Sequence, residues 1–104
     1  MQIVHEFKDN VLNIKIKGDI DHHTAKEVRA DIDTLVLESS PKELVLDLSG
    51  VEFMDSSGLG LVLGRYKKQS DFGRKMKIIN PTRRIVQILQ LAGVEKIIKI
   101  EGMR

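Results

Sequence analysis

The chain has 104 residues, of which 41% are hydrophobic and 31% charged, with a formal net charge of +2. This length and composition are typical of one globular domain, which we expect to span residues 1–104. Because the chain has no cysteine, disulfides, thiolate metal sites and cysteine nucleophiles are excluded. No apolar run approaches the roughly 20 residues that cross a bilayer, and the first residues lack the basic and apolar regions of a signal peptide. We therefore expect a cytoplasmic protein without membrane contact.

The first part of the chain predicts a hairpin followed by a helix. Residues 2–7 and 11–17 alternate between apolar and polar side chains as strands do, and the second strand should have one solvated face. After a loop, a helix is expected over residues 22–39, with apolar residues at helical spacing along one side. Either Asp21 or Thr24 could cap its N-terminus, since both side chains accept hydrogen bonds from helical amides.

The middle of the chain predicts a buried strand and a second helix. Residues 44–48 are mostly apolar, and the helix should begin after Asp55 and end near residues 71–73. Leu61 lies off the apolar stripe of this helix, so we expect it to be exposed. The stripe itself contains Leu59, Val62, Leu63 and Tyr66.

The last part predicts a strand, a helix and a final strand. Residues 75–79 form the first strand, and Asn80 and Pro81 supply an N-cap and a first-turn proline for the helix. The helix should end at residues 92–93, and residues 94–100 should form the last strand. Strands that alternate with helices indicate a single α/β domain with a mainly parallel β-sheet, an antiparallel N-terminal edge strand and α-helices packed against it.

Two serines mark the turn from the middle strand segment into the second helix. Ser56 and Ser57 follow Asp55, and a serine oxygen at a helix start can accept a hydrogen bond from a free amide. A phosphate there would meet the positive end of the helix dipole beside the Asp55 carboxylate, so it would change the local electrostatics strongly. This turn is therefore the main candidate site, with capping and phosphorylation both open.

A small serine hydrolase is one alternative, with Ser56 as nucleophile and His22 or His23 as base. The surrounding sequence is not a G-x-S-x-G elbow, and nothing in it supplies an obvious oxyanion hole. Adjacent histidines point in different directions on a helix, so no metal site is expected. The aspartates are interpreted as caps or loop hydrogen-bond acceptors rather than magnesium ligands: Asp19, Asp21, Asp47 and Asp55.

A nucleotide- or nucleic-acid-binding module is the other alternative, because basic residues crowd the second half. The glycines from Gly58 onward do not form a dinucleotide fingerprint, since Leu63 stands where the third glycine is required. The chain has few aromatic residues and no helix-turn-helix signature, which favours solvated faces over a nucleic-acid interface. The basic residues are Arg65, Lys67, Lys68, Arg74, Lys75, Lys77, Arg83 and Arg84.

Three blocks of sequence carry a family resemblance. They are residues 18–25 (GDIDHHTA), 53–60 (FMDSSGLG) and 63–67 (LGRYK), and Ala92-Gly93-Val94 extends the match toward the end. Together they closely resemble the anti-sigma factor antagonists of the STAS domain class, over nearly the whole chain. The resemblance favours the members that act in sporulation and release sigma F.

The resemblance implies a regulatory cycle. The unphosphorylated protein would bind an anti-sigma factor that is also a serine kinase, which releases a sigma factor for transcription. Phosphorylation of Ser56 would stop this binding, a metal-dependent serine phosphatase would restore it, and Ser57 would be the helix-start neighbour. The protein would then be a ligand and a substrate rather than an enzyme, with no cofactor and no direct contact with nucleic acid.

The physics of a phosphate agrees with such a switch. A phosphate adds about −1.5 to −2 charges at neutral pH, which would repel an acidic partner surface without refolding the domain. We expect the partner face to surround Ser56, with Leu61 contributing an exposed apolar contact. Its residues are Asp21, His22, Thr24, Asp55, Ser57, Gly58, Leu61 and Arg65.

Overall fold

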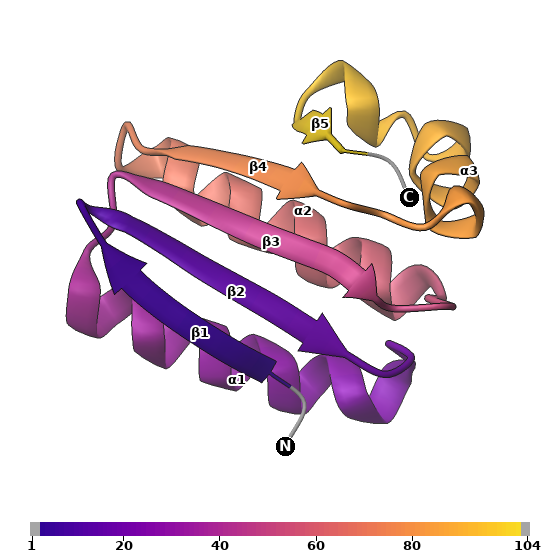
Figure 1. The fold of residues 1–104 in the computed structure, drawn as a ribbon, viewed down its shortest axis with the longest axis horizontal. Helices are drawn as coiled ribbons and strands as arrows, with labels where there is room; N and C mark the ends of the chain where they lie inside the picture. Colours follow the sequence, from indigo (N-terminus) through magenta and orange to yellow (C-terminus); the bar gives the residue numbers. More distant parts are fainter. Residues whose placement is uncertain (1–2, 103–104) are drawn as a thin grey trace.

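The computed structural model describes residues 3–102. Within them, five strands form one sheet that is covered by helices (Figure 1). The strands are β1 (Ile3–Lys8), β2 (Val11–Lys17), β3 (Glu43–Gly50), β4 (Lys75–Ile79) and β5 (Lys99–Glu101). The helices are α1 (His22–Ser39), α2 (Ser56–Asp71) and α3 (Arg83–Leu91), and a short 3₁₀ helix, η1, covers Val94–Lys96.

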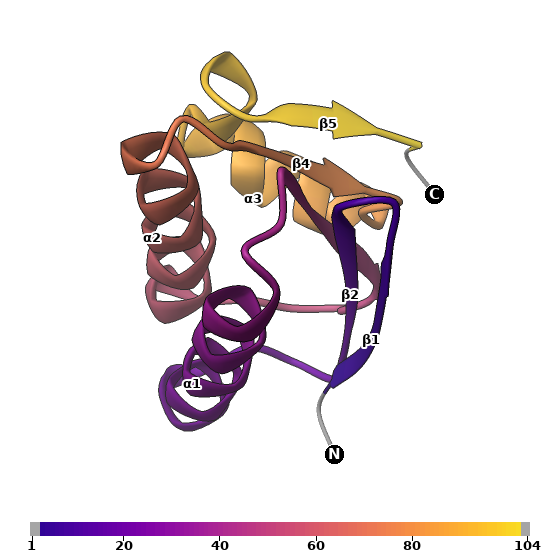
Figure 2. The ribbon, with the colours of Figure 1, turned by 90° about the vertical axis from the view of Figure 1, so that its left-hand side faces the viewer.

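The strands follow one another across the sheet in chain order. β1 pairs with β2 in the antiparallel sense, and the pairs β2–β3, β3–β4 and β4–β5 are parallel. Right-handed crossovers that advance in one direction place their helices on the same face of a sheet, and Figure 2 shows α1 and α2 together on one side of it. The predicted α/β fold with an antiparallel N-terminal edge strand is confirmed.

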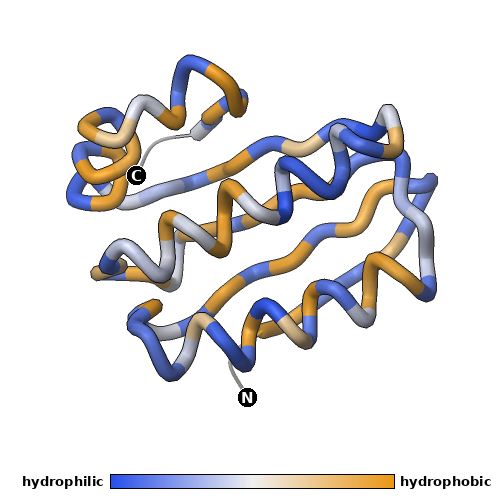
Figure 3. Tube along the Cα trace, turned by 180° about the vertical axis from the view of Figure 1, so that it is seen from behind, coloured by the Kyte–Doolittle hydropathy of each residue, from blue (hydrophilic) through white to orange (hydrophobic). Residues whose placement is uncertain are grey.

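The core lies between this helical layer and the sheet. Leu12, Ile14 and Ile16 of β2 are almost completely buried, as their alternation predicts, while Lys15 and Lys17 are exposed. Figure 3 shows hydrophobic residues along the strands and at intervals along the helices. Because this alternation decides which face of β2 is solvated, it also decides which face receives the helices.

Most of the predicted elements up to residue 79 are nearly correct. The bounds of α1 are those expected from its apolar spacing, and β4 likewise covers the predicted residues. β1 includes Lys8, because the hairpin turn uses only Asp9 and Asn10, both with positive φ (53° and 65°). The predicted start of this strand at Gln2 lies outside the described residues.

The start of α3 differs from the prediction. Thr82, not Asn80, is the N-cap, and its hydroxyl accepts a hydrogen bond from the amide of Ile85 at 3.3 Å. Asn80 instead adopts a left-handed conformation (φ 53°) and donates its backbone N–H to the carbonyl of Glu101 at 2.8 Å. Asn80 therefore hydrogen-bonds to the edge strand β5 instead of capping α3, and Pro81 precedes the cap rather than following it.

The expected strand over residues 94–100 is also wrong. Residues 94–96 form η1, and only Lys99–Glu101 pair with β4. Val94 and Ile98 are buried whereas Lys96 is exposed. A continuous strand would turn all three residues to the same face, so a helical turn is the conformation that keeps the lysine in water.

An isolated pair of residues joins the two loops that lead into α1 and α2. Ile20 and Met54 form a parallel bridge, with the Ile20 N–H donating to Phe53 O (3.0 Å) and the Asp55 N–H donating to Ile20 O (3.2 Å). Both bridging side chains are buried. Gly58 packs directly on this pair, since a Cβ at Gly58 would lie 2.7 Å from the Cβ of Met54. The starts of α1 and α2 are therefore held together.

This contact generates a prediction about two glycines of α2. Gly58→Ala should lower the free energy of unfolding by about 1 kcal/mol or more, because the new methyl group overpacks against Met54. Gly64→Ala is the matched control, since no atom beyond its chain neighbours and its own helical turn lies within 4 Å of its added Cβ; it should raise stability by about 0.5–1 kcal/mol through helix propensity. Urea unfolding measures both, and equal effects at the two positions would contradict this packing.

Candidate functional site

Each of the two neighbouring helices begins with an aspartate cap. Asp21 Oδ1 accepts hydrogen bonds from the backbone amides of His23 and Thr24, both at 2.9 Å, and Thr24 Oγ1 accepts from the Asp21 N–H at 2.8 Å. Asp55 Oδ1 accepts from the Ser57 amide at 2.8 Å and from the Gly58 amide at 3.3 Å. Both residues considered for the α1 cap thus contribute, in a reciprocal capping box.

The serines occupy the first two positions of α2 and do not cap it. Capping by a serine is one interpretation of the sequence at this turn. It is wrong, because the Asp55 carboxylate already accepts the hydrogen bonds from the amides of the first turn. Ser56 is exposed, whereas Ser57 is half-buried. Ser56 is thus exposed to solvent at a helix N-terminus that Asp55 caps.

The charge of the α1 cap is stabilised by the same hydrogen bonds that build it. The backbone hydrogen bond from Thr24 lowers the pKa of Asp21 below its ordinary value, and further hydrogen bonds from Thr24 and His23 act in the same direction. The carboxylate is exposed. It therefore carries a full negative charge on the surface next to the start of α2.

A groove of about 450 Å³ runs between α1 and α2. Two glycines of α2, Gly60 and Gly64, border it with open space where a side chain would lie. Ser57 lies at this groove together with His22, whereas Ser56 does not line it. The groove is lined by His22, Ala25, Lys26 and Arg29 from α1 and by Ser57, Gly60, Leu61, Gly64 and Arg65 from α2.

Leu61 and Arg65 are buried, which corrects the expectation that Leu61 is exposed. Leu61 is 3% exposed and Arg65 is 5% exposed. The predicted apolar stripe is offset from the most buried face of α2, because Leu59, Leu63 and Tyr66 are only partly buried. The helix packs against α1 as well as β4, and its buried residues are Gly58, Leu61, Val62, Arg65 and Gln69. Leu61 borders the groove between α1 and α2 instead of forming an apolar contact on the surface.

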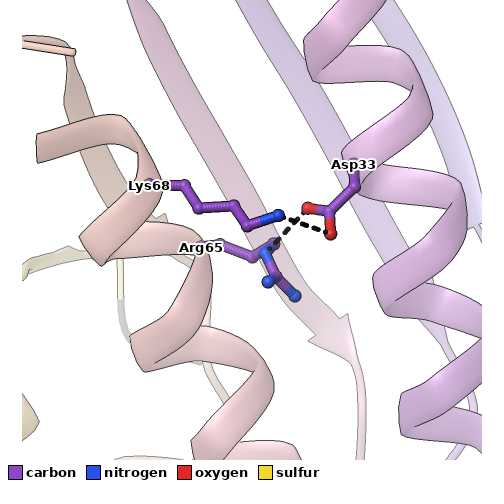
Figure 4. A network of polar contacts seen from close by, with 3 residues as sticks. All are labelled: Asp33, Arg65 and Lys68. Carbon is purple, nitrogen blue, oxygen red and sulfur yellow. Dashed lines mark hydrogen bonds and ion pairs between the residues drawn. The ribbon is translucent and has the colours of Figure 1, made fainter. Parts of the chain in front are cut away.

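A network of ion pairs crosses from α2 to α1. Arg65 Nε lies 3.0 Å from Asp33 Oδ1, and Lys68 Nζ lies 3.2 Å from Asp33 Oδ2 (Figure 4). Burial lowers the pKa of Arg65, the Asp33 carboxylate raises it, and the nearby Arg29 lowers it again. One carboxylate thus serves two cations at the interface of the helices.

The structure brings most of the predicted partner face together at the paired helix starts, but at different depths. Asp21 and His22 are exposed beside Ser56, whereas Gly58 is buried beneath it. Five groove residues were missed by sequence reasoning. A four-residue spacing on each helix could have found most of them, since it relates Ala25 to Arg29 and Gly60 to Gly64, but it does not include Lys26. The missed groove residues are Ala25, Lys26, Arg29, Gly60 and Gly64.

Neither alternative function gains support from this geometry. The groove brings His22 toward Ser57 rather than the proposed nucleophile Ser56. Of the eight basic residues in the second half, four have carboxylate partners: Arg65, Lys67, Lys68 and Lys77. Within residues 3–102, no three His, Asp or Glu side chains gather to hold a metal ion, and no helix is long and apolar enough to cross a membrane.

The Asp21 cap generates a prediction about acid stability. Because its folded-state pKa lies below the ordinary 3.8, the ionised cap stabilises the fold above that pH, and this contribution is lost as pH falls through the folded-state pKa. Asp21→Asn keeps a capping side chain but cannot titrate. Thermal unfolding between about pH 5 and pH 2 should show a smaller loss of stability in the variant than in the wild type. Parallel pH profiles would contradict this role.

Comparisons with known proteins place the chain in a family. Residues 2–102 match the family described as the STAS domain. An anti-sigma F factor antagonist from Paenibacillus polymyxa is 36% identical over 100 residues, which cover 96% of this chain and 86% of that protein. The unphosphorylated anti-sigma factor antagonist SpoIIAA has a TM-score of 0.70 at 28% identity, covering 85% of this chain and 81% of its own. Phosphorylated SpoIIAA, a Bacillus cell fate determinant, has a TM-score of 0.74 at 26% identity, covering 94% and 89%. The chain therefore belongs to the STAS domain family, and within that family it is similar to anti-sigma factor antagonists.

Proposed function

We propose that this protein is an anti-sigma factor antagonist that is switched by phosphorylation of Ser56. Its unphosphorylated form binds an anti-sigma factor that is also a serine kinase, and this binding releases the sigma factor. The observation that carries the proposal is the exposure of Ser56 at the start of α2, next to a cap that Asp55 already provides. Ser56 is thus accessible to a kinase, and its modification leaves the hydrogen bonds of the helix start in place.

The switch acts through surface charge. Asp55 already accepts hydrogen bonds from the Ser57 and Gly58 amides, so a phosphate on Ser56 does not find these donors free. Its charge of about −1.5 to −2 therefore remains at the surface, beside the carboxylates of Asp55 and Asp21. The match of this chain to SpoIIAA in both its unphosphorylated and phosphorylated forms supports a modification that leaves the fold intact.

The relatives suggest the setting of the switch. The Paenibacillus relative is named an anti-sigma F factor antagonist, so we assign sigma F, and with it sporulation, as the pathway of this chain. A metal-dependent serine phosphatase reverses the modification in the cytoplasm. The protein acts as ligand and substrate, requires no cofactor and does not contact nucleic acid. Its partner face comprises the exposed Asp21 and His22 and the half-buried Thr24, Asp55 and Ser57 around Ser56. Leu61 and Arg65 contribute only where they border the adjoining groove, and Gly58 supports the face from beneath.

The first prediction from this proposal concerns the modified residue. Purified anti-sigma kinase from the same organism, supplied with radiolabelled ATP, should label the wild type and Ser57→Ala to the same stoichiometry and should not label Ser56→Ala. Ser57 is a matched control because it is the adjacent serine but is half-buried at the groove. Full labelling of Ser56→Ala would show that the acceptor lies elsewhere.

The second prediction concerns binding. Ser56→Ala should bind the kinase as the wild type does, whereas Ser56→Asp should weaken binding at least about tenfold, since a like charge in an interface costs 1.4 kcal/mol or more. Ser70→Asp places the same charge on an exposed residue near the far end of α2 and should leave the affinity unchanged. Isothermal titration measures all three, and an equal loss in Ser70→Asp would contradict a local switch.

A further inference from the structure

The buried guanidinium of Arg65 has donors that lack a hydrogen-bond acceptor among residues 3–102. Its side chain is 94% buried, with 6% exposed, yet Nη1 has no hydrogen-bond partner among residues 3–102. Nε lies within ion-pair distance of Asp33 but does not form a hydrogen bond with it. Buried donors almost always have partners, and an unpaired charged donor is the costliest kind. The site therefore indicates a missing acceptor.

The groove that Arg65 borders is positively charged. Lys26, Arg29 and Arg65 are among its lining residues, and none of the lining residues is a carboxylate. Asp33 lies nearby but is shared between Arg65 and Lys68, both within ion-pair distance. Arg29 is close enough to lower the pKa of Arg65. The guanidiniums of Arg29 and Arg65 thus lie near one another, and the shared carboxylate of Asp33 does not balance their positive charge. The missing hydrogen-bond acceptor is therefore an anion.

The groove has room for such a group. Its volume is about 450 Å³, and the space above Gly60 and Gly64 is open, since no atom from another part of the chain lies within 4 Å of a Cβ built at either position. Figure 4 shows the Arg65 side chain extending from α2 into the space between the two helices, toward α1. An incoming side chain can therefore approach the α2 backbone closely and reach the part of Arg65 that lines the groove.

Resting on the proposed function, we infer that an acidic side chain of the anti-sigma factor enters this groove, where its carboxylate accepts hydrogen bonds from the Arg29 guanidinium and from the guanidinium of Arg65, whose side chain turns toward it. A carboxylate fits because its two oxygens match the planar fork of donors on an arginine. Ser57 lies at the same groove, directly after Ser56 in the chain. A phosphate on Ser56 then repels a partner segment that is itself acidic, which explains why phosphorylation stops binding.

The charge of the groove is tested with three variants in titrations against the purified anti-sigma factor. Arg29→Gln removes an exposed charge at the groove and should weaken binding about tenfold or more. Arg65→Lys keeps the positive charge but loses the planar pair of N–H donors of the guanidinium, and it should weaken binding to a similar degree. Lys67→Gln is the matched control, because Lys67 lies on α2 but outside the groove; it should bind within about twofold of the wild type. Thermal unfolding of each variant reports folding, and Arg29→Gln alone decides the test if Arg65→Lys is unstable.

The identity of the occupant is tested by a double-mutant cycle. Each Asp and Glu of the anti-sigma factor is changed to its amide and titrated against the wild type and Arg29→Gln. For one of these carboxylates, the loss of affinity on its change to the amide should be about tenfold smaller against Arg29→Gln than against the wild type. If Arg29→Gln binds as the wild type does, or if every pair is additive, the inference is wrong. Inorganic phosphate that binds the wild type but not Arg29→Gln, with partner affinity unchanged, would also overturn it and indicate a small-anion site.

The two levels of the proposal fail in different ways. If the wild type binds the anti-sigma factor and Ser56→Asp weakens that binding, the proposed function holds whatever the groove variants do. Unchanged binding of Arg29→Gln in that case overturns the groove inference alone. If the wild type does not bind, the proposed function and the inference both fall.

Discussion

The contact between Ile20 and Met54 is the constraint on which the rest of the site depends. Strands added in chain order already bring the N-termini of α1 and α2 to one edge of the sheet (Figure 1), but this alone leaves the two loops free to move apart. The bridge joins them through backbone hydrogen bonds, and both side chains are buried. Gly58 packs directly against the pair. The two loops are thereby held side by side as one surface.

The division of labour between Asp55 and Ser56 follows from the geometry of a helix N-terminus. One acceptor can satisfy the amides at the second and third helical positions, and Asp55 does so. The residue at the first helical position then does not have to cap the helix, and Ser56 is exposed there. A modification at such a position adds charge without removing a hydrogen bond that the fold requires, which is the physical condition for a reversible switch in a small domain.

The polar contact between α1 and α2 makes the surface beside Ser56 unusual. Helices on one face of a sheet normally close against each other with apolar side chains, but here Arg65, Lys68 and Asp33 cross between them. Gly60 and Gly64 leave open space along the same interface. The result is a groove with a buried cation rather than a closed seam. Its positive charge is complementary to an acidic partner, and in the proposed switch a phosphate on Ser56 acts on that same complementarity.

Local sequence patterns alone determined the fold class, the bounds of α1 and the turn that carries Ser56, because alternation and helical spacing depend only on which neighbours share a face. They did not determine the cap of α3, the turn at residues 94–96 or the burial of Leu61. Each of those depends on a distant partner: the sheet edge at Glu101, the core beneath Val94, and α1. Only the tertiary structure decided them, since a helix that meets two neighbours buries more than the single stripe its sequence displays. The Nη1 atom of Arg65, which lacks a hydrogen-bond partner among residues 3–102, is likewise placed by the meeting of α1 and α2.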